Sequence, residues 1–448
     1  MIELRGKEVI VVGLGASGLA AARLCLRRGA RVTLNDAKPD GALGDAVHAL
    51  VRAGATLAAG GHDAVRLEKA DLVVVSPGVP SFESLEAAER GGVRVIGEVE
   101  LAVQSLTTAA PVIAVGGTNG KSTTTTLIGA MLAADGRRTF TGGNLGEPLA
   151  DHVDEAFDVI VLEVSSFQME RIETFKPRVS LLLNVTEDHL DRYPSFEAYA
   201  HAKGNAFVRQ TAEDLAVVPA GDAACLSQGR RGQARIVTFG PSGDVAVESE
   251  AIVDTRSGER FLRREIALSG GHNALNAASA LAAVADLGIA PSSIRKALAT
   301  FRGLAHRMVL VGEIDQVRYY DDSKGTNVGA VVTALLGLEE SKTVLIAGGR
   351  DKGGSYAPLA KALEEKGRAA VLIGEAAQAI SDALAGTLPV RRAGTLDAAV
   401  RAAAELARPG DAVLLSPACS SYDMFRDYKH RGEEFARAVE RLAEERRS

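Results

Sequence analysis

The sequence predicts an α/β protein with three domains. Apolar runs rich in β-branched residues stand at 9–12, 112–115 and 344–347, and each is followed by a glycine turn and a helical stretch rich in Ala and Leu. Strands that alternate with helices in this way form parallel sheets joined by right-handed crossovers. At roughly 150 residues per domain, a chain of 448 residues holds about three domains.

The domain boundaries are expected near residues 99 and 305, which gives domains 1–99, 100–304 and 305–448. Residues 97–99 precede a predicted helix, and residues 301–304 form the second linker. Between 219 and 270, Gly, Ser and short alternating strands predict a small antiparallel β insertion in the central domain. A helix that contains residues 273–287 is expected after this insertion.

Composition excludes several classes of protein. Lys and Arg number 51 against 57 Asp and Glu, for a net charge of −6, so no broad basic surface is available to nucleic acid. Aromatic residues make up 4% without Trp, which disfavours base stacking on single strands. The longest uncharged run, residues 101–120, is interrupted by polar side chains, so we expect no membrane-spanning segment. The expected partner is a small molecule.

The three cysteines also indicate a compartment. Cys25, Cys225 and Cys419 are widely separated and form no CxxC pair. This spacing suggests neither a disulfide framework nor a thiolate zinc site. We therefore expect a cytoplasmic protein.

A first glycine loop covers residues 13–18, between a strand and a helix. Asp36 ends the next strand, as in dinucleotide-binding fingerprints. The glycines permit a tight turn and the approach of a pyrophosphate to the helix N-terminus. NAD is one candidate ligand, and any nucleotide diphosphate satisfies the same physics. The structural alternative is a turn that only packs the strand against the helix. This pattern makes the first domain Rossmann-like.

A second glycine loop covers residues 116–123 and predicts an ATP site. It departs from GxxxxGK[ST] because Val115 stands at the first glycine position. The roles survive, since backbone N–H groups can cradle phosphates, Lys121 can reach the outer phosphates and Ser122 can meet Mg²⁺. A chance match is the alternative. The central domain is accordingly predicted to be of the P-loop ATPase type.

Acidic residues at neighbouring strand ends are candidate Mg²⁺ ligands. Glu163 ends the apolar run 159–162, although it could instead be a charge at the N-terminus of the helical segment that follows. The run 181–183 also leads into a polar segment, and this segment points to a site because it follows a buried strand. Its polar residues are Asn184, Thr186, Asp188, His189 and Asp191.

Lys203 lies on the apolar face of a predicted helix. Ser195 is a plausible N-cap, and Phe196, Tyr199 and Phe207 recur with Lys203 at helical spacing. An unpaired ammonium there is costly, so the lysine either extends its head to solvent or is held beside a metal.

In the third domain, Arg307 follows the linker, and Lys324 belongs to the polar segment 322–327 that follows a strand. Both cations could close over ATP from outside, or they could be ordinary surface charges. Segments 348–352 and 416–421 each follow a buried strand, where ligands of open α/β sheets bind. The third domain is also expected to be Rossmann-like.

The motifs at 117–122, 163–168 and 184–193 together resemble the Mur ligases of peptidoglycan synthesis. Segments 76–79, 142–146, 322–324 and 415–421 are similar to those of the ligases that add D-glutamate. The resemblance runs in order from residue 1 to about 440.

The resemblance implies that the domains bind different ligands. Domain 1–99 is expected to bind the UDP part of UDP-N-acetylmuramoyl-L-alanine instead of NAD, through Gly15, Ser17, Asp36, Ser76 and Gly78, with Asn144 nearby. Domain 100–304 is expected to bind ATP together with two Mg²⁺ ions. The implied ATP-binding residues are Gly116, Gly117, Thr118, Asn119, Gly120, Lys121, Ser122, Thr123, Asn273 and Asn276, with Arg307, Asp322 and Lys324 from domain 305–448.

The resemblance also implies catalytic and metal-binding roles. The catalytic residues are expected to be Lys121, Glu163, His189 and Lys203, and the metal ligands Ser122, Glu163, His189 and Lys203. Lys203 matches the lysine that is carbamylated in the family, so that a cation becomes a Mg²⁺-binding carbamate. This would account for its apolar face.

Domain 305–448 is implied to bind glutamate. The expected contacts are His189, Thr326, Lys352, Ser421 and Tyr428. The chain departs from the family pattern at Ala37 and Lys38, where a hydroxyl residue and Arg are expected, and at Tyr428, where Phe is expected.

The implied reaction is ATP-driven amide formation in cell-wall biogenesis, on which cell shape and division depend, by a cytoplasmic monomer. The acceptor carboxylate attacks the γ-phosphate to form an acyl phosphate, and the glutamate amine then displaces phosphate, leaving ADP and phosphate as products. One alternative is another amino-acid-adding Mur or folylpolyglutamate-type ligase. Others are an NAD-dependent oxidoreductase and a nucleotide-sensing binding protein.

Overall fold

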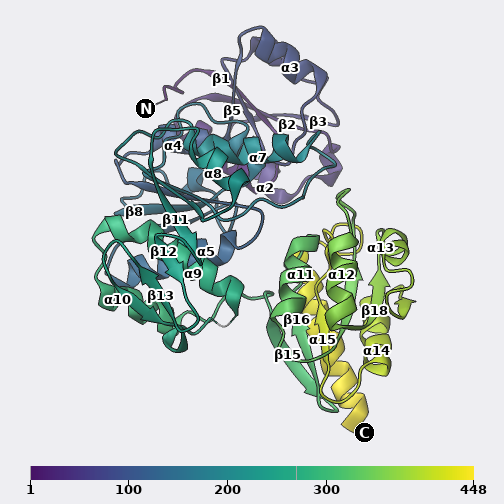
Figure 1. The fold of residues 1–448 in the computed structure, drawn as a ribbon. Helices are drawn as coiled ribbons and strands as arrows, with labels where there is room; N and C mark the ends of the chain where they lie inside the picture. The colour runs from purple at the N-terminus through teal and green to yellow at the C-terminus, as the bar shows by residue number, and fades with distance from the viewer. Residues whose placement is uncertain (1, 269, 448) are drawn as a thin grey trace. The chain divides into compact units, whose positions relative to one another are not determined.

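The computed structural model describes residues 2–268 and 270–447, and these form three sheets covered by helices (Figure 1). The chain divides into two compact units. The first contains Met1–Val185, Glu197–Ala267 and Ala274–Phe301, and the second contains Thr186–Phe196, Leu268–Asn273 and Arg302–Ser448. Two sheets lie in the first unit and one in the second.

The N-terminal sheet has the order β3-β2-β1-β4-β5, and all its strand pairs are parallel. Its strands are β1 Glu8–Val12, β2 Arg31–Asp36, β3 Thr56–Ala59, β4 Leu72–Val75 and β5 Arg94–Gly97. Its helices are α1 Ala16–Arg27, α2 Asp45–Arg52, α3 Glu83–Arg90 and α4 Glu98–Ser105, with 3₁₀ turns η1 Asp40–Ala42 and η2 Leu67–Lys69. Val9 and Val11 pack toward α1, whereas Ile10 and Val12 pack toward α3, which is the pattern of a sheet covered on both faces.

The central sheet has nine strands in the order β14-β13-β12-β11-β10-β9-β6-β8-β7. Its strands are β6 Val112–Gly116, β7 Thr139–Gly143, β8 Val159–Glu163, β9 Val179–Leu182, β10 Leu215–Pro219, β11 Arg235–Gly240, β12 Val245–Val247, β13 Ala251–Asp254 and β14 Arg260–Leu262. The pairs β12–β13 and β13–β14 are antiparallel, whereas β11 pairs with both its neighbours in parallel. The antiparallel strands therefore extend one edge of the parallel sheet.

The helices of the central region are α5 Lys121–Ala134, α6 Ser166–Met169, α7 Phe196–Gly204, α8 Ala223–Gly229, α9 Gly271–Val284 and α10 Pro291–Thr300. The 3₁₀ turns are η3 Leu149–Asp151, η4 Asn205–Phe207, η5 Arg263–Glu265 and η6 Ala285–Leu287. The helix expected at 273–287 therefore begins at Gly271, and its last residues form a 3₁₀ turn. Phe207 likewise lies in the turn after α7.

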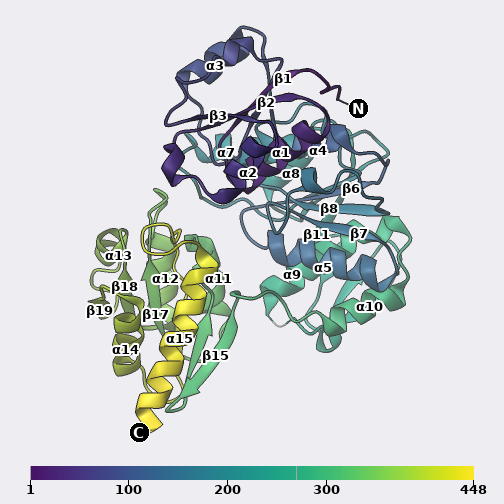
Figure 2. The same ribbon diagram turned by 180° about the vertical axis from the view of Figure 1, so that it is seen from behind.

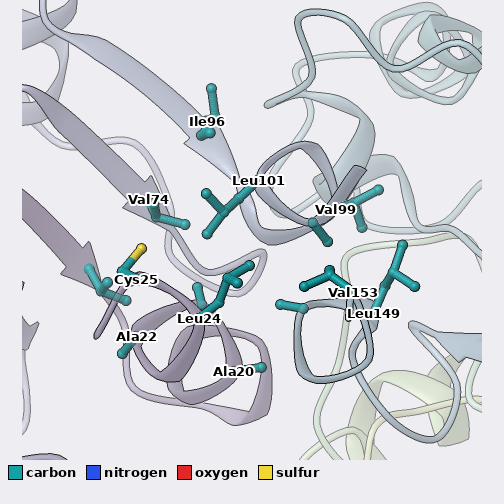
Figure 3. Close-up of a cluster of buried hydrophobic side chains, with 14 of the residues drawn as sticks. Ala20, Ala22, Leu24, Cys25, Val74, Ile96, Val99, Leu101, Leu149 and Val153 are labelled. Atoms are coloured by element: carbon teal, nitrogen blue, oxygen red, sulfur yellow. The ribbon is translucent and has the colours of Figure 1, made fainter. Parts of the chain in front are cut away.

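One apolar core joins the N-terminal and central sheets. Figure 3 shows Leu24 of α1 and Leu101 of α4 in the same cluster as Leu149 and Val153 of the central region. Each of these leucines is fully buried, which contributes about 1.5–3 kcal/mol per side chain. This shared core explains why two sheets form one unit.

The C-terminal sheet has the order β15-β16-β20-β17-β18-β19, and only the β15–β16 pair is antiparallel among its described strands. The strands are β15 Val309–Ile314, β16 Val317–Asp321, β17 Thr343–Gly348, β18 Gly367–Ile373, β19 Val390–Arg392 and β20 Ala412–Leu415. The helices are α11 Val328–Gly337, α12 Ala357–Lys366, α13 Ala377–Ala383, α14 Leu396–Leu406 and α15 Tyr428–Arg447. Helices α11, α12 and α13 pack on one face, and α14 and α15 pack on the other (Figure 2).

The predicted α/β class is confirmed, with doubly covered sheets in the N-terminal and C-terminal regions. The boundaries at residues 99 and 305 stay predictions. Among the described residues, no helix combines the length and the apolar character needed to cross a bilayer.

Candidate active site

The second glycine loop joins β6 to α5. Gly117 and Gly120 have φ values of 140° and 84°, a region that favours glycine. A Cβ at Gly120 would lie 2.4 Å from Oδ1 of Asn276, which stands on α9. The loop therefore needs glycine both for its conformation and for the close approach of Asn276.

Asn184 fixes the shape of this loop. Its backbone carbonyl accepts from the Thr118 N–H at 2.9 Å, and its Oδ1 accepts from the Asn119 N–H at 2.8 Å. Its amide Nδ2 donates to the Asn119 carbonyl at 3.1 Å. Lys121 begins α5 and donates from Nζ to the Thr118 carbonyl at 2.8 Å. Asn184 was noted in the sequence only as a polar residue after a strand, and its support of the loop was not predicted.

Glu163 ends β8 and is 3% exposed. Its Oε1 accepts from Nδ2 of Asn144 at 2.7 Å, whereas its buried Oε2 has no hydrogen-bond partner in the described part of the chain. A buried carboxylate oxygen of this kind is costly unless a cation or donor meets it. It is also the hard oxygen ligand that Mg²⁺ prefers.

The residues present fit a magnesium site only in part. Within residues 2–268 and 270–447, no cluster of three or more His, Cys, Asp or Glu side chains could hold a metal ion. Ser122 is buried at the start of α5. A magnesium site here would therefore need oxygens in addition to the Glu163 carboxylate, such as the Ser122 hydroxyl or a modified Lys203.

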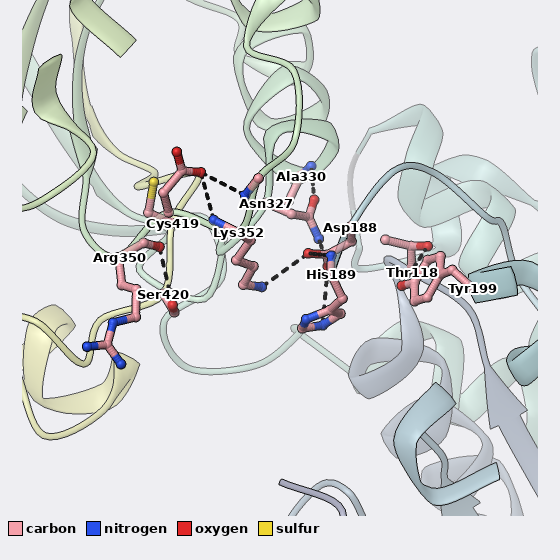
Figure 4. A network of polar contacts seen from close by, with 12 residues as sticks. Thr118, Asp188, His189, Tyr199, Asn327, Ala330, Arg350, Lys352, Cys419 and Ser420 are labelled. Atoms are coloured by element: carbon pink, nitrogen blue, oxygen red, sulfur yellow. Dashed lines mark hydrogen bonds and ion pairs between the residues drawn. The ribbon is translucent and has the colours of Figure 1, made fainter. Parts of the chain in front are cut away.

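Lys203 is buried, with 6% of its surface exposed. Its Nζ donates to the Gly117 carbonyl at 2.8 Å and lies 4.4 Å from the ring centroid of Tyr199. The Tyr199 hydroxyl is in turn 3.3 Å from Oγ1 of Thr118 (Figure 4). The alternative in which Lys203 extends its head to solvent is wrong, because the ammonium is buried against the glycine loop.

The first glycine loop joins β1 to α1, and its backbone is braced by side chains. Both oxygens of Asp36 accept backbone N–H groups, from Leu14 at 2.8 Å and from Lys38 at 2.9 Å. Oγ of Ser76 donates to the Gly13 carbonyl at 2.6 Å. A Cβ at Gly18 would lie 1.9 Å from that carbonyl, so this position requires glycine.

In the second unit, Asp188 is the centre of a polar cluster (Figure 4). It is 7% exposed and meets Nζ of Lys352 at 3.3 Å and Nδ2 of Asn327 at 3.2 Å. Nε2 of His189 lies 3.7 Å from the same carboxylate, and the His189 backbone has a φ of 57°. Asp188, Asn327 and Lys352 line a pocket of about 230 Å³, together with Tyr356.

The segment after β16 holds a second group of the predicted residues. Asp322 is fully buried and accepts from Oγ of Ser416 at 2.6 Å. Burial raises the pKa of Asp322 to about 6, although the nearby Arg307 guanidinium opposes this. The Nε of Arg307 is buried and has no hydrogen-bond partner within the described part of the chain. Nζ of Lys324 lies 5.3 Å from the ring centroid of Tyr428.

Arg431 on α15 joins two of these segments and was not predicted. It is 1% exposed and donates from Nη2 to the carbonyls of Ser323 at 2.9 Å and Cys419 at 3.2 Å. Burial lowers the pKa of Arg431 to about 10. Arg431 lies at helical spacing from Phe435 and Leu442 and is therefore on the apolar face of the helix. The same spacing identified Lys203 as a candidate.

The predicted site residues therefore fall into two sets. The first unit brings together the glycine loop 116–123, Asn144, Glu163, Lys203 and Asn276, and it also holds the predicted UDP-binding residues Gly15, Ser17, Asp36, Ser76 and Gly78. The second unit holds His189, Asn273, Arg307, Asp322, Lys324, Thr326, Lys352, Ser421 and Tyr428. Of the predicted glutamate contacts, Lys352 lines the pocket, whereas His189, Thr326, Ser421 and Tyr428 do not.

Sequence models of protein families match most of the chain in three consecutive segments. The N-terminal domain of MurD-like Mur ligases matches residues 7–97, the Mur ligase middle domain matches 115–284, and the Mur ligase glutamate ligase domain matches 306–419.

Two relatives that match over nearly their full length share one name. A UDP-N-acetylmuramoylalanine–D-glutamate ligase of Syntrophotalea carbinolica is 47% identical over 99% of both chains, and one of Desulfosudis oleivorans is 45% identical over 99% of this chain and 98% of its own.

Among solved structures, a pseudomurein peptide ligase of Methanothermus fervidus has a TM-score of 0.63 at 20% identity, over 98% of this chain and 100% of its own. A MurF ligase of Thermotoga maritima in complex with ADP has a TM-score of 0.62 at 18% identity, over 99% and 96%. These two likenesses concern the fold alone. The three family segments and the full-length identities show that this chain belongs to the Mur ligase family.

Proposed function

We propose that the chain is an ATP-dependent ligase that joins D-glutamate to UDP-N-acetylmuramoyl-L-alanine and releases ADP and phosphate. The observation that carries the proposal is the glycine loop 116–123 beside the buried Glu163 carboxylate, in a chain that matches ligases of this name from end to end. The reaction forms an amide of a peptidoglycan precursor.

The residues of the first unit act on phosphate. The acceptor carboxylate attacks the γ-phosphate of ATP, and negative charge develops on the transferred group and the leaving ADP. Lys121 and the backbone N–H groups at the start of α5 stabilise that charge. Glu163 and Ser122, together with Lys203 and His189, would hold two Mg²⁺ ions. The metal would neutralise charge at the phosphates.

Lys203 is proposed to carry a carbamate. The ammonium first gives up one proton, and the neutral amine then adds to CO₂ and loses a second, so the buried cation becomes an anion with two oxygens. The remaining N–H can still donate to the Gly117 carbonyl, which now accepts from Nζ at 2.8 Å. The modification would supply oxygen ligands for Mg²⁺ in addition to those of the described carboxylates.

The second unit is proposed to bind the amino acid. Lys352 supplies a cation at the pocket of about 230 Å³. Asp188 pairs with the Lys352 ammonium, and Asn327 donates in turn to Asp188. A substrate carboxylate there forms a charge-assisted hydrogen bond with Lys352. The amine then attacks the acyl phosphate. Thr326, Ser421 and Tyr428 do not line this pocket, but we propose them as further glutamate contacts, with His189 near the amine. Arg307, Asp322 and Lys324 are proposed to bind the nucleotide.

We further propose that the protein works as a cytoplasmic monomer on small molecules, with domains 1–99, 100–304 and 305–448 serving the UDP part, ATP and glutamate. The buried free thiols Cys25, Cys225 and Cys419 suit a reducing compartment. Sedimentation of the purified protein tests the monomer.

Phosphate release tests the function. With ATP and Mg²⁺, we expect release only when both UDP-N-acetylmuramoyl-L-alanine and D-glutamate are present, because the acyl phosphate needs a bound carboxylate and the amine completes turnover. Release with a folate and L-glutamate would favour a folylpolyglutamate-type ligase. NADH consumption on the same sample would favour an oxidoreductase, and full ATP hydrolysis without acceptor would contradict the proposal.

A further inference from the structure

We propose that His62 determines specificity for the base of the nucleotide substrate, by accepting a hydrogen bond from the imide N–H of uracil. The inference rests on the proposed function, which gives the N-terminal sheet a UDP-containing substrate. It concerns a side chain that the sequence analysis did not select and that the reaction itself does not use.

The first step is the position of His62. It follows β3, and the backbone N–H of Gly60 donates to the carbonyls of Asp36 at 3.1 Å and Lys38 at 2.9 Å. These bonds fasten the segment after β3 to the segment after β2, at the carboxyl edge of a parallel sheet, where ligands of such sheets bind. His62 is therefore held beside Ala37 and Lys38, two of the positions at which the sequence departs from its family pattern.

The second step is the proton on the ring. Nδ2 of Asn35 donates to the carbonyls of Ala58 at 2.8 Å and Gly61 at 2.9 Å, and carbonyls only accept. The amide orientation is thus fixed, so Oδ1 of Asn35 must be the atom that accepts from Nδ1 of His62 at 2.6 Å. Because Nδ1 carries the proton of the neutral ring, Nε2 is left as an acceptor. Nε2 has no hydrogen-bond partner within residues 2–268 and 270–447.

The third step is the plane of the ring. Phe82, which precedes α3, stacks on His62 with a centroid distance of 4.2 Å and an interplanar angle of 12°. The two rings come from the loops after β3 and β4, on either side of β1 and β2. Both side chains are half-buried, so one edge of the imidazole remains accessible. The buried Asn35 and the stacked Phe82 together fix the direction of the Nε2 lone pair.

A directed acceptor distinguishes bases by their hydrogen-bonding edges. The N3 position of uracil carries a proton and can donate to Nε2. Cytosine presents a lone pair at the same position, which would face the lone pair of Nε2 without a proton between them. Methylation of N3 in uracil removes the donor and adds bulk. The geometry thus predicts that the first domain prefers UDP to both CDP and 3-methyl-UDP.

The experiment measures the affinities of UDP, CDP and 3-methyl-UDP by calorimetry on the full chain. For the wild type we expect UDP to bind about tenfold more tightly than either analogue, the size expected for one hydrogen bond and its lost partner. His62→Ala should reduce both ratios to near one and raise the KM for the UDP acceptor, with KM values for ATP and D-glutamate unchanged.

His48→Ala is the matched control, because His48 is a partly exposed histidine on α2 of the same sheet domain whose contact is with Asp40. It should keep both wild-type ratios. Equal binding of UDP and 3-methyl-UDP by the wild type would overturn the inference, as would a His62→Ala variant with undiminished ratios. A wild-type protein that binds no UDP would instead contradict the proposed function.

Discussion

The two glycine loops of the first unit, residues 13–18 and 116–123, have the same local fold, but the charged side chains beside them are of opposite sign. Each leads from a buried parallel strand into a helix, and each contains glycine at positive φ, namely Gly13 in the first and Gly117 and Gly120 in the second. In the first loop, the Leu14 N–H is bonded to the carboxylate of Asp36. In the second, the Asn119 N–H is bonded to the neutral amide of Asn184, and Lys121 lies beside it.

This difference shows why a glycine fingerprint selects phosphate chemistry without naming the ligand. The first loop holds an anion of its own, so a ligand phosphate there must approach through N–H groups that Asp36 does not occupy, and against its charge. The second loop has a cation. Near it in the same sheet lies the buried Oε2 of Glu163, which has no hydrogen-bond partner among the described residues. Only the second arrangement suits a triphosphate with its metal.

The largest expected effect comes from Lys203→Ala, which removes the buried amine that contacts the second loop. We expect nearly complete loss of ligase activity, because the proposed carbamate oxygens disappear, and partial recovery when a short carboxylic acid such as formate is added. Phosphate release measures both. Lys176→Ala, at an exposed lysine of the same unit, is the control. Retention of most activity by Lys203→Ala would remove the carbamate from the mechanism.

Lys121→Ala should lower kcat by about 10²-fold or more, from lost stabilisation of charge on the transferred phosphoryl group. Steady-state phosphate release measures this, with Lys296→Ala on the exposed side of α10 as the control. The KM for the UDP acceptor should change little if the two loops serve different ligands. An unchanged kcat would show that the second loop is not the phosphate cradle.

Much of this comparison could be predicted from the sequence, because it depends on local patterns. A strand, a glycine turn and a helix are adjacent in the chain, so both loops could be identified. The spacing around Lys203 placed it on an apolar helix face but left open whether its head reaches solvent, and the structure buries it. Arg431 gave the same signal on α15 but was missed, since no motif adjoined it. Its partners are the carbonyls of Ser323 and Cys419, which only the folded sheet brings to it.

Other contacts could not be predicted because their partners are distant in sequence and carry no pattern. Asn184 binds the glycine loop through backbone as well as side-chain atoms, and backbone partners leave no trace in residue type. Asp188 was seen as one member of a polar segment, but its pairing with Lys352 and Asn327 depends on tertiary structure. The pocket that these residues line is likewise a property of the fold.

Lys352→Ala lies outside both glycine loops and so shows whether their effects are separable from amino-acid binding. It removes one charge-assisted contact, and we expect the KM for D-glutamate to rise about tenfold, equivalent to about 1.5 kcal/mol. The KM values for ATP and the UDP acceptor should stay near those of the wild type. Lys361→Ala, at an exposed lysine on α12, is the control. Comparable D-glutamate KM values in wild type and Lys352→Ala would exclude this residue from the pocket, and preference for L-glutamate would overturn the specificity.

The smallest expected effect comes from Asp36→Ala in the first loop. The change leaves the N–H groups of Leu14 and Lys38 without their acceptor, and because the site is only partly buried, water can replace part of the lost bonding. We expect a loss of about 1 kcal/mol in the free energy of unfolding and a rise of a few fold in the KM for the UDP acceptor. The KM for ATP should not move.

Chemical denaturation and steady-state kinetics measure these effects of Asp36→Ala, with Asp63→Ala as a control at an exposed aspartate after β3. Asp36→Asn sharpens the test, because its amide oxygen can still accept one N–H while the negative charge is gone. If the Asp36 charge opposes a ligand phosphate, Asp36→Asn should bind UDP at least as tightly as the wild type does, with a smaller loss of stability than Asp36→Ala. An equal rise in the KM for ATP and for the UDP acceptor in Asp36→Ala would mean that the two loops act on one ligand, and the contrast between them would fail.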